Sequence, residues 1–288
     1  MPRVESTNPC LLVFVVDQSL SMKEPIGGSK APKKDALASA VNQYLYKLAR
    51  FKCRSSAPDG SAVIRPRFHI ALIGYSGERV YSAFEGPLAG RSTVPIDELS
   101  ANPIEIVPQV IVEDGIEETS KVPVWLRPKS DGNTPMYSAL EQAATIVKRW
   151  LVDWPHVTVP PIVLNITDGQ FTSGPDPTGI AQQLSCIQVG ERHVLAFNLH
   201  LSEHDGESVF CPETLSSDKD EWARLLFDIS SELTPEMRAV AREKGYDLAE
   251  RARGFAFNAD IAKVFDFLDI GTVPLEQEGV FQLPAGRG

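Results

Sequence analysis

The run CLLVFVVDQSLS, residues 10–21, decides the fold. Its first seven residues are all apolar, which is typical of a central strand covered on both faces. The strand is followed directly by Asp17 and by the hydroxyl side chains of Ser19 and Ser21. Residues 32–50 then carry apolar side chains at intervals of three and four, which predicts a helix with one buried face. A strand, a polar loop and a helix therefore open the chain.

The same alternation continues to the end of the sequence. The patterns predict strands over 68–76, 79–84, 161–167, 193–201 and 254–258, and helices over 134–151, 180–186, 221–229, 235–253 and 261–268. Strands that alternate with helices predict an α/β fold, with a mostly parallel central sheet and helices on both faces. We expect one antiparallel edge strand.

Composition limits the classes of partner. The 288 residues include 28 Lys and Arg against 38 Asp and Glu, a formal net charge of -10, which repels nucleic acid and anionic membranes. The longest apolar run is too short to span a bilayer, and the first residues show no signal region, so we expect a cytoplasmic protein. The four cysteines are scattered without a C-x-x-C pair, and we expect them to be reduced.

One segment interrupts the alternation. Residues 86–131 are rich in Pro, Glu and Val without a clear period, although short strands are expected at VPQVIV and VPVWLRP. We interpret this segment as an elaboration within a single domain over 8–270, followed by a C-terminal tail over 271–288.

Oxygen-bearing side chains stand where predicted strands end. Asp17 and Asp168 each follow a buried strand, Ser19 and Ser21 lie in the first loop, and Thr134 opens a helix. Ligands of parallel α/β sheets gather at the carboxyl ends of the strands. Two carboxylates and three hydroxyls are hard ligands that suit Mg²⁺ better than Zn²⁺. Because hydroxyls are neutral, the ion would keep much of its charge and attract an outside carboxylate.

Three separated motifs, D-x-S-x-S, DGNTPMYSAL and NITDGQFT, together resemble the von Willebrand factor A family and its metal-ion-dependent adhesion site. The resemblance covers roughly 8–270. It implies a Rossmann-like fold and a Mg²⁺ site, with Mn²⁺ or Ca²⁺ as other candidate ions, formed by Asp17, Ser19, Ser21, Thr134 and Asp168, some of them acting through water. Leu20 stands where the family usually has glycine, and the spacing to Thr134 is longer than usual.

The resemblance also implies a function. Members of this family act as interaction modules, and we expect the metal to bind an Asp or Glu of a partner protein. The intracellular bacterial type is favoured, in which the fold often accompanies AAA ATPases or kinase and phosphatase signalling systems. The chain is then a scaffold and not an enzyme.

Other interpretations remain open. Asp17, Ser19 and Thr134 could each be ordinary helix caps, and Asp168 could simply form a turn. A phosphohydrolase that uses Asp17 as nucleophile would resemble the haloacid-dehalogenase group, which has a second aspartate two residues later as acid or base, where Ser19 stands here. A structural scaffold with an empty metal site is the third alternative.

The histidines suggest no further site. His200 and His204 are four residues apart, but His200 belongs to a predicted strand, so the two would not share a helical face. We expect this pair at the surface, and His69 and His193 packed within strands.

Overall fold

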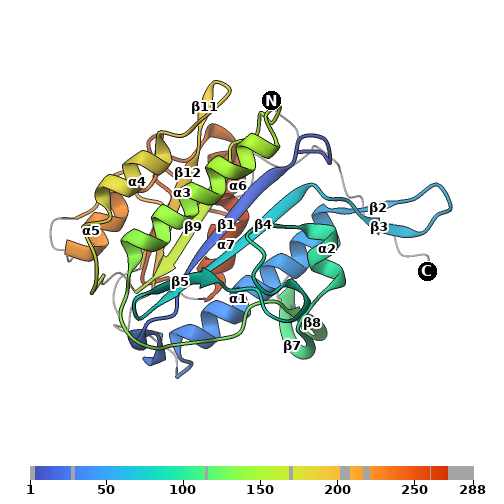
Figure 1. The fold of residues 1–288 in the computed structure, drawn as a ribbon, viewed down its shortest axis with the longest axis horizontal. Coiled ribbons are helices and arrows are strands. Elements are labelled where there is room, and N and C mark those ends of the chain that lie inside the picture. Colours follow the sequence, from blue (N-terminus) through green and yellow to red (C-terminus); the bar gives the residue numbers. More distant parts are fainter. Residues whose placement is uncertain are drawn as a thin grey trace.

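A computed structural model describes residues 4–26, 30–113, 116–168, 171–201, 208–216, 221–259 and 261–271. Its centre is an eight-stranded sheet in the order β13-β14-β12-β9-β1-β4-β5, with β6 also paired to β4 (Figure 1). The strands are β1 (Cys10–Asp17), β4 (Phe68–Ser76), β5 (Arg79–Ser82), β6 (Val94–Pro95), β9 (Ile162–Thr167), β12 (Leu195–His200), β13 (Val209–Phe210) and β14 (Phe255–Phe257). The predicted α/β class with a mostly parallel sheet is confirmed.

Helices cover both faces of this sheet. They are α1 (Lys33–Lys47), α2 (Ile96–Ala101), α3 (Met136–Asp153), α4 (Thr178–Ser185), α5 (Glu221–Asp228), α6 (Pro235–Glu243) and α7 (Ile261–Gly271). Strand β1 alternates between two buried clusters: Leu12 and Phe14 pack in the cluster of α1, α6 and α7, whereas Leu11 and Val13 pack in the cluster of α3, α4 and α5. Burial on both faces explains why the β1 sequence is apolar without alternation.

Antiparallel strands lie at both ends of the sheet, and not only at one. Strands β5 and β6 pair antiparallel with β4, and β13 pairs antiparallel with β14. The remaining pairings, among β1, β4, β9, β12 and β14, are parallel. The sheet therefore has more antiparallel strands than the one edge strand that we expected.

The helix predicted over 235–253 is too long. Helix α6 ends at Glu243, and Gly245 follows with φ +89°. Glycine adopts this left-handed conformation without steric cost and commonly terminates a helix. The prediction extended the helix through this turn because it relied on the spacing of apolar residues alone.

The segment 86–131 contains regular structure. It forms a short 3₁₀ helix (Gly86–Leu88), β6, α2 and a hairpin of β7 (Glu105–Glu113) and β8 (Ile116–Val124). Asn42 of α1 fixes the end of this hairpin, because its amide donates to the carbonyl of Leu126 at 2.9 Å and accepts from the backbone N–H of Trp125 at 2.9 Å. A second hairpin, β2 (Arg54–Ser56) with β3 (Ala62–Ile64), was not predicted.

The structure also bears on membrane-spanning segments, on the cysteines and on the C-terminal tail. Within the described ranges, no helix is both long and apolar enough to cross a membrane. All four cysteines are free thiols; Cys10, Cys53 and Cys211 are buried and Cys186 is exposed. Of the predicted C-terminal tail, residues 272–288 lie outside the described residues.

Candidate metal site

Asp17 and Asp168 come together because their strands are neighbours. Strands β1 and β9 pair in parallel, with Val16 opposite Ile166, so the residues that follow them leave the sheet at the same edge. Asp17 is fully buried and Asp168 is 9% exposed. Two carboxylates therefore meet at the carboxyl edge of the sheet, where α/β proteins commonly bind ligands.

The loop after β1 curls back on Asp17. The backbone N–H of Ser19 donates to Oδ1 of Asp17 at 2.9 Å, and the hydroxyl oxygens of Ser19 and Ser21 lie 3.1 Å apart. A 3₁₀ helix, Leu20–Lys23, follows, but the Ser19 side chain makes no capping hydrogen bond to it. The side chains of Ser19 and Ser21 thus remain directed to one another and not to the helix end, in contrast to the helix-cap interpretation of Ser19.

Thr134 belongs to a segment that joins the two other parts of the site. Gly132, two residues earlier, accepts a hydrogen bond from the backbone N–H of Leu20 at 3.0 Å. The backbone N–H of Thr134 donates to the hydroxyl of Thr172 at 2.9 Å. Thr134 is 2% exposed, and α3 begins at Met136 without a side-chain cap, so Thr134 does not cap this helix.

The surroundings of Asp17 change the pKa of its carboxyl group. Burial, and after it the charge of Asp168, raise the pKa of Asp17 to about 6 against the lowering effect of hydrogen bonds from Ser19 and Thr167. The hydroxyl of Thr167 donates to Oδ2 of Asp17 at 2.7 Å. Thr167 was not among the predicted site residues; its position one residue before Asp168, at the end of a buried strand, was the available signal.

Lys33 is the second residue that the sequence analysis missed. Its ammonium nitrogen Nζ lies 3.2 Å from Oδ2 of Asp168, and both side chains are almost completely buried. Lys33 is the first residue of α1 and lies four residues before Leu37, on the buried stripe that also carries Val41 and Tyr44. Its position on the apolar stripe of the helix could have indicated from the sequence that Lys33 is buried.

The donor set fits a small divalent ion. Octahedral Mg²⁺ binds oxygens at about 2.1 Å, which separates neighbouring ligands by about 3 Å, and the Ser19 and Ser21 hydroxyls are 3.1 Å apart. Oδ1 of Asp168 is buried and has no hydrogen-bond partner in the described part of the chain. A buried carboxylate oxygen without a partner is costly, and a bound cation would satisfy it.

All side-chain donors of this set are oxygen atoms. No cluster of three or more His, Cys, Asp or Glu side chains that could hold a metal occurs among the residues that the structure describes. The candidate site instead combines two carboxylates with hydroxyls. Gly169 and Gln170 of the third motif, and Gly27 to Ser29 of the loop before α1, lie outside the described residues.

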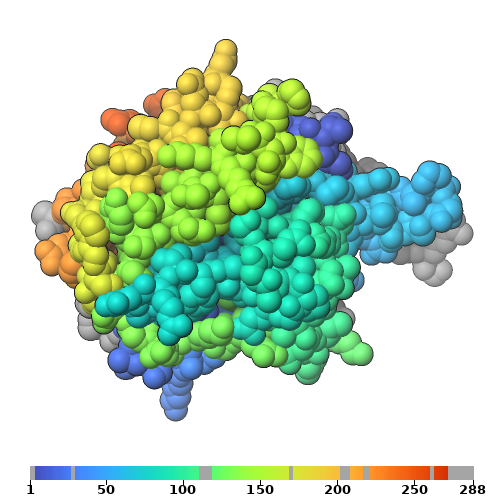
Figure 2. All heavy atoms as spheres, viewed as in Figure 1, coloured from blue at the N-terminus to red at the C-terminus, as the bar shows by residue number. Residues whose placement is uncertain are grey.

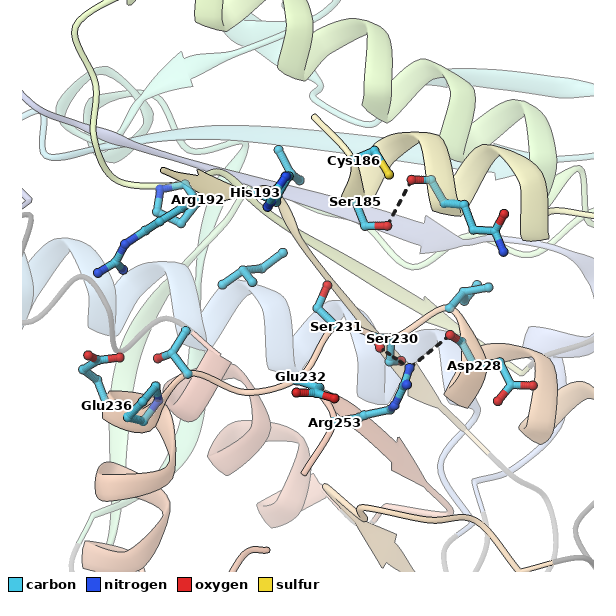
Figure 3. Close-up of a pocket in the computed structure, with 17 residues that line it drawn as sticks. Ser185, Cys186, Arg192, His193, Asp228, Ser230, Ser231, Glu232, Glu236 and Arg253 are labelled. Atoms are coloured by element: carbon cyan, nitrogen blue, oxygen red, sulfur yellow. Dashed lines mark hydrogen bonds between the residues drawn. The ribbon is translucent and has the colours of Figure 1, made fainter. Parts of the chain in front are cut away.

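A second cavity, of about 810 Å³, lies at the opposite edge of the sheet (Figure 3). It is lined by Pro160 and Leu195, at the amino ends of β9 and β12, and by Cys186, His193 and Arg253. None of the five predicted metal ligands lines it. This cavity is therefore separate from the candidate metal site.

The histidines differ from their predicted environments in two cases. His69 is packed as expected, with its Nδ1 accepting from Trp150 at 2.9 Å. His193 is exposed beside the second cavity, and not packed. His200 lies in β12 as predicted but is buried and stacks on Phe257, so its expected surface position is wrong. His204 lies outside the described residues.

Comparisons with known proteins address the fold. No protein-family model and no curated protein matches the chain. Among solved structures, proximal thread matrix protein 1 from the mussel byssus is 14% identical, with a TM-score of 0.47, over 95% of this chain and 48% of that one. The manganese-loaded TRAP protein of Plasmodium vivax is 13% identical, with a TM-score of 0.43, over 94% and 75%. A form of the mussel protein with a zinc-occupied MIDAS motif is 18% identical, with a TM-score of 0.37, over 69% and 37%.

The chain thus spans about half the length of the mussel protein. At these identities the likeness concerns the course of the chain, and it assigns no ligand or partner to individual residues.

Proposed function

We propose that this chain is a metal-dependent protein-interaction module, in which Asp17, Ser19, Ser21, Thr134 and Asp168 hold Mg²⁺ and the ion captures an Asp or Glu of a partner protein. The observation that carries this proposal is the meeting of two buried carboxylates, one of which keeps an oxygen without a hydrogen-bond partner in the described structure. The motif order that resembles the von Willebrand factor A family supports the same function.

The charges of the site explain why an acidic partner is expected. Asp17 and Asp168 carry two negative charges when ionised, and Lys33 carries one positive charge. A divalent ion would therefore bring the formal charge of the site to +1. When bound, the ion supplies a positive charge to which an outside carboxylate oxygen can coordinate, and that carboxylate would bring the formal charge to zero.

The proposed role is binding and not catalysis. A phosphohydrolase of the haloacid-dehalogenase type, with Asp17 as nucleophile, would need an acid or base two residues later, where the Ser19 hydroxyl instead lies beside that of Ser21. We expect no turnover of a generic phosphomonoester in Mg²⁺. Hydrolysis that disappears in the Asp17→Asn variant would replace the proposed role with an enzymatic one.

Three finer assignments belong to the same proposal. Mg²⁺ in preference to Mn²⁺ or Ca²⁺ is proposed from the hard oxygen donors, a cytoplasmic location is proposed from the sequence analysis, and a place in a bacterial signalling or AAA ATPase-associated system is suggested by the family resemblance.

The test is a capture experiment with matched site variants. The native chain and Asp168→Ala are immobilised and exposed to an extract of the source cells in Mg²⁺ or in EDTA. The proposal predicts a protein that is retained only by the native chain in Mg²⁺, and that is lost when one of its acidic residues is replaced by the corresponding amide. Equal retention in EDTA would locate recognition away from the metal.

A further inference from the structure

A polar groove borders the candidate metal site. It has a volume of about 950 Å³ and is lined by residues 76–79 of the β4–β5 turn, by Tyr81, by 128–131, and by Lys23 and Lys34. Figure 2 shows these three parts of the chain, β5, the segment before α3 and the region around the start of α1, meeting at the lower left of the molecule. Segments distant in sequence thus form one continuous surface.

Residues that line the groove contact the loop that follows Asp17. Tyr81, on the groove side, donates its hydroxyl to Oε1 of Gln18 at 2.6 Å, and Gln18 is the residue after Asp17. The backbone N–H of Asp131 donates to the carbonyl of Gln18 at 2.8 Å. Lys34 follows Lys33 directly in α1. The groove therefore lies beside the loop that carries Asp17 and Ser19.

Positive charge gathers in the groove. Its lining residues include four cations and two acids, a formal charge of +2, in a chain whose formal net charge is -10. The cations are Lys23, Lys34, Arg79 and Lys129, and the acids are Glu78 and Asp131. Lys129 pairs with Glu85 at 2.6 Å. The three remaining cations form no ion pair within the described ranges, so their charges stay available to an anion.

We propose that this groove binds an acidic segment of the partner protein, whose carboxylates flank the one that the metal captures. The inference rests on the proposed function and adds the class of sequence that the module recognises. In an extended segment, alternate side chains point the same way at intervals of about 7 Å, so several carboxylates can face one groove.

Charge favours a peptide over a nucleic acid as the occupant. A phosphate backbone carries charge at every residue and would meet the repulsion of the whole chain, whose formal net charge is -10. A short acidic segment can confine its charges to the groove. Lysines act as adaptable point charges toward carboxylates, and three of the four groove cations are lysines.

The experiment compares two double variants with equal loss of charge. Lys34→Gln with Arg79→Gln removes two cations from the groove, whereas Lys148→Gln with Arg149→Gln removes two exposed cations from α3, away from the groove. The probe is a fluorescent peptide of alternating glutamate and glycine, and its control has glutamine in place of glutamate. Binding is followed by fluorescence anisotropy in Mg²⁺, and thermal unfolding confirms that both variants remain folded.

The groove variant is expected to bind the glutamate peptide about fivefold more weakly, while the α3 variant binds as the native chain does. The difference should shrink as salt rises from about 0.1 M to about 1 M, because the screening length falls from about 10 Å to about 3 Å. Equal affinities of the two variants, equal binding of the glutamine peptide, or displacement of the peptide by low concentrations of inorganic phosphate would overturn the proposal.

Direct titration with Mg²⁺ separates this proposal from the proposed function. A native chain that binds no Mg²⁺ contradicts the proposed function. A chain that binds Mg²⁺ and the peptide, but is insensitive to the groove substitutions, contradicts the groove alone.

Discussion

The ammonium group of Lys33 lies 3.2 Å from Oδ2 of Asp168, inside the constellation of predicted metal ligands. Both side chains are buried, at 2% and 6% exposure. The lysine therefore neutralises one of two adjacent buried carboxylates. A divalent ion would enter a site that already contains a fixed positive charge, so Lys33 is expected to weaken metal binding while it stabilises the metal-free protein.

Replacement of Lys33 by methionine tests this relationship. Methionine keeps most of the apolar stem and removes the charge, so the affinity for Mg²⁺ should rise at least about tenfold. The metal-free variant should lose stability, because removing one partner of a buried ion pair costs roughly 3 to 5 kcal/mol. Isothermal titration and thermal unfolding, each with and without Mg²⁺, measure the two effects.

Lys34→Met is the matched control, because Lys34 is the neighbouring residue and lines the groove instead. It should leave the Mg²⁺ affinity unchanged. Equal effects of the two substitutions would show that Lys33 acts only through the general charge of the region.

Asp17→Asn addresses the pH dependence of the metal-free protein. Burial and Asp168 raise the pKa of Asp17 from 3.8 to about 6, so the folded chain holds this proton more tightly than the unfolded chain. Ionisation of Asp17 therefore lowers the stability of the folded protein. The cost is absent below about pH 4, grows between about pH 4 and 6, and reaches about 3 kcal/mol above pH 6.

In EDTA, Asp17→Asn should thus be more stable than the native chain at pH 7.5, and the difference should vanish near pH 3.5. Urea unfolding at both pH values measures it. Addition of Mg²⁺ should reverse the order at pH 7.5, because the ion stabilises only the chain that binds it. A difference between the two chains that is independent of pH would contradict the assigned cause.

Gly132→Ala tests the position of the Thr134 segment. Gly132 has φ +60°, and a Cβ atom there would lie 2.5 Å from Cα of Gly77. The segment must shift to accommodate it, which would move Thr134 and weaken Mg²⁺ binding by at least about tenfold.

Gly60→Ala is its control. Gly60 also has a positive φ, of +81°, but nothing lies within 4 Å of the added Cβ. It should cost stability through its backbone conformation alone and leave Mg²⁺ affinity as in the native chain. Loss of Mg²⁺ affinity in both variants would point to general destabilisation.

The sequence predicts the framework of this protein well, because its strands are buried on both faces. Apolar runs such as residues 10–16 mark the sheet, and the residues directly after them mark its carboxyl edge. The meeting of Asp17 with Asp168 follows from that pattern. The identity of the bound ion, and its coordination by these residues and Thr134, stays a prediction.

What the sequence did not reveal depends on tertiary contacts. Lys33 was read as part of a helix, because periodicity does not show that a lysine on the buried stripe meets an aspartate 135 residues later. The hairpin of β2 and β3 was missed because its strands have three residues each. Helix α6 was extended too far because a glycine inside a helical pattern is a weak stop signal on its own.

Calorimetric titration of Mg²⁺ into the metal-free native chain and into Asp17→Ala tests the central claim most directly. The account predicts saturable binding of one ion by the native chain and none by the variant, with the variant folded as judged by circular dichroism. Equal, negligible heats in the two proteins would contradict it, and would leave a scaffold in which Lys33 balances a buried carboxylate.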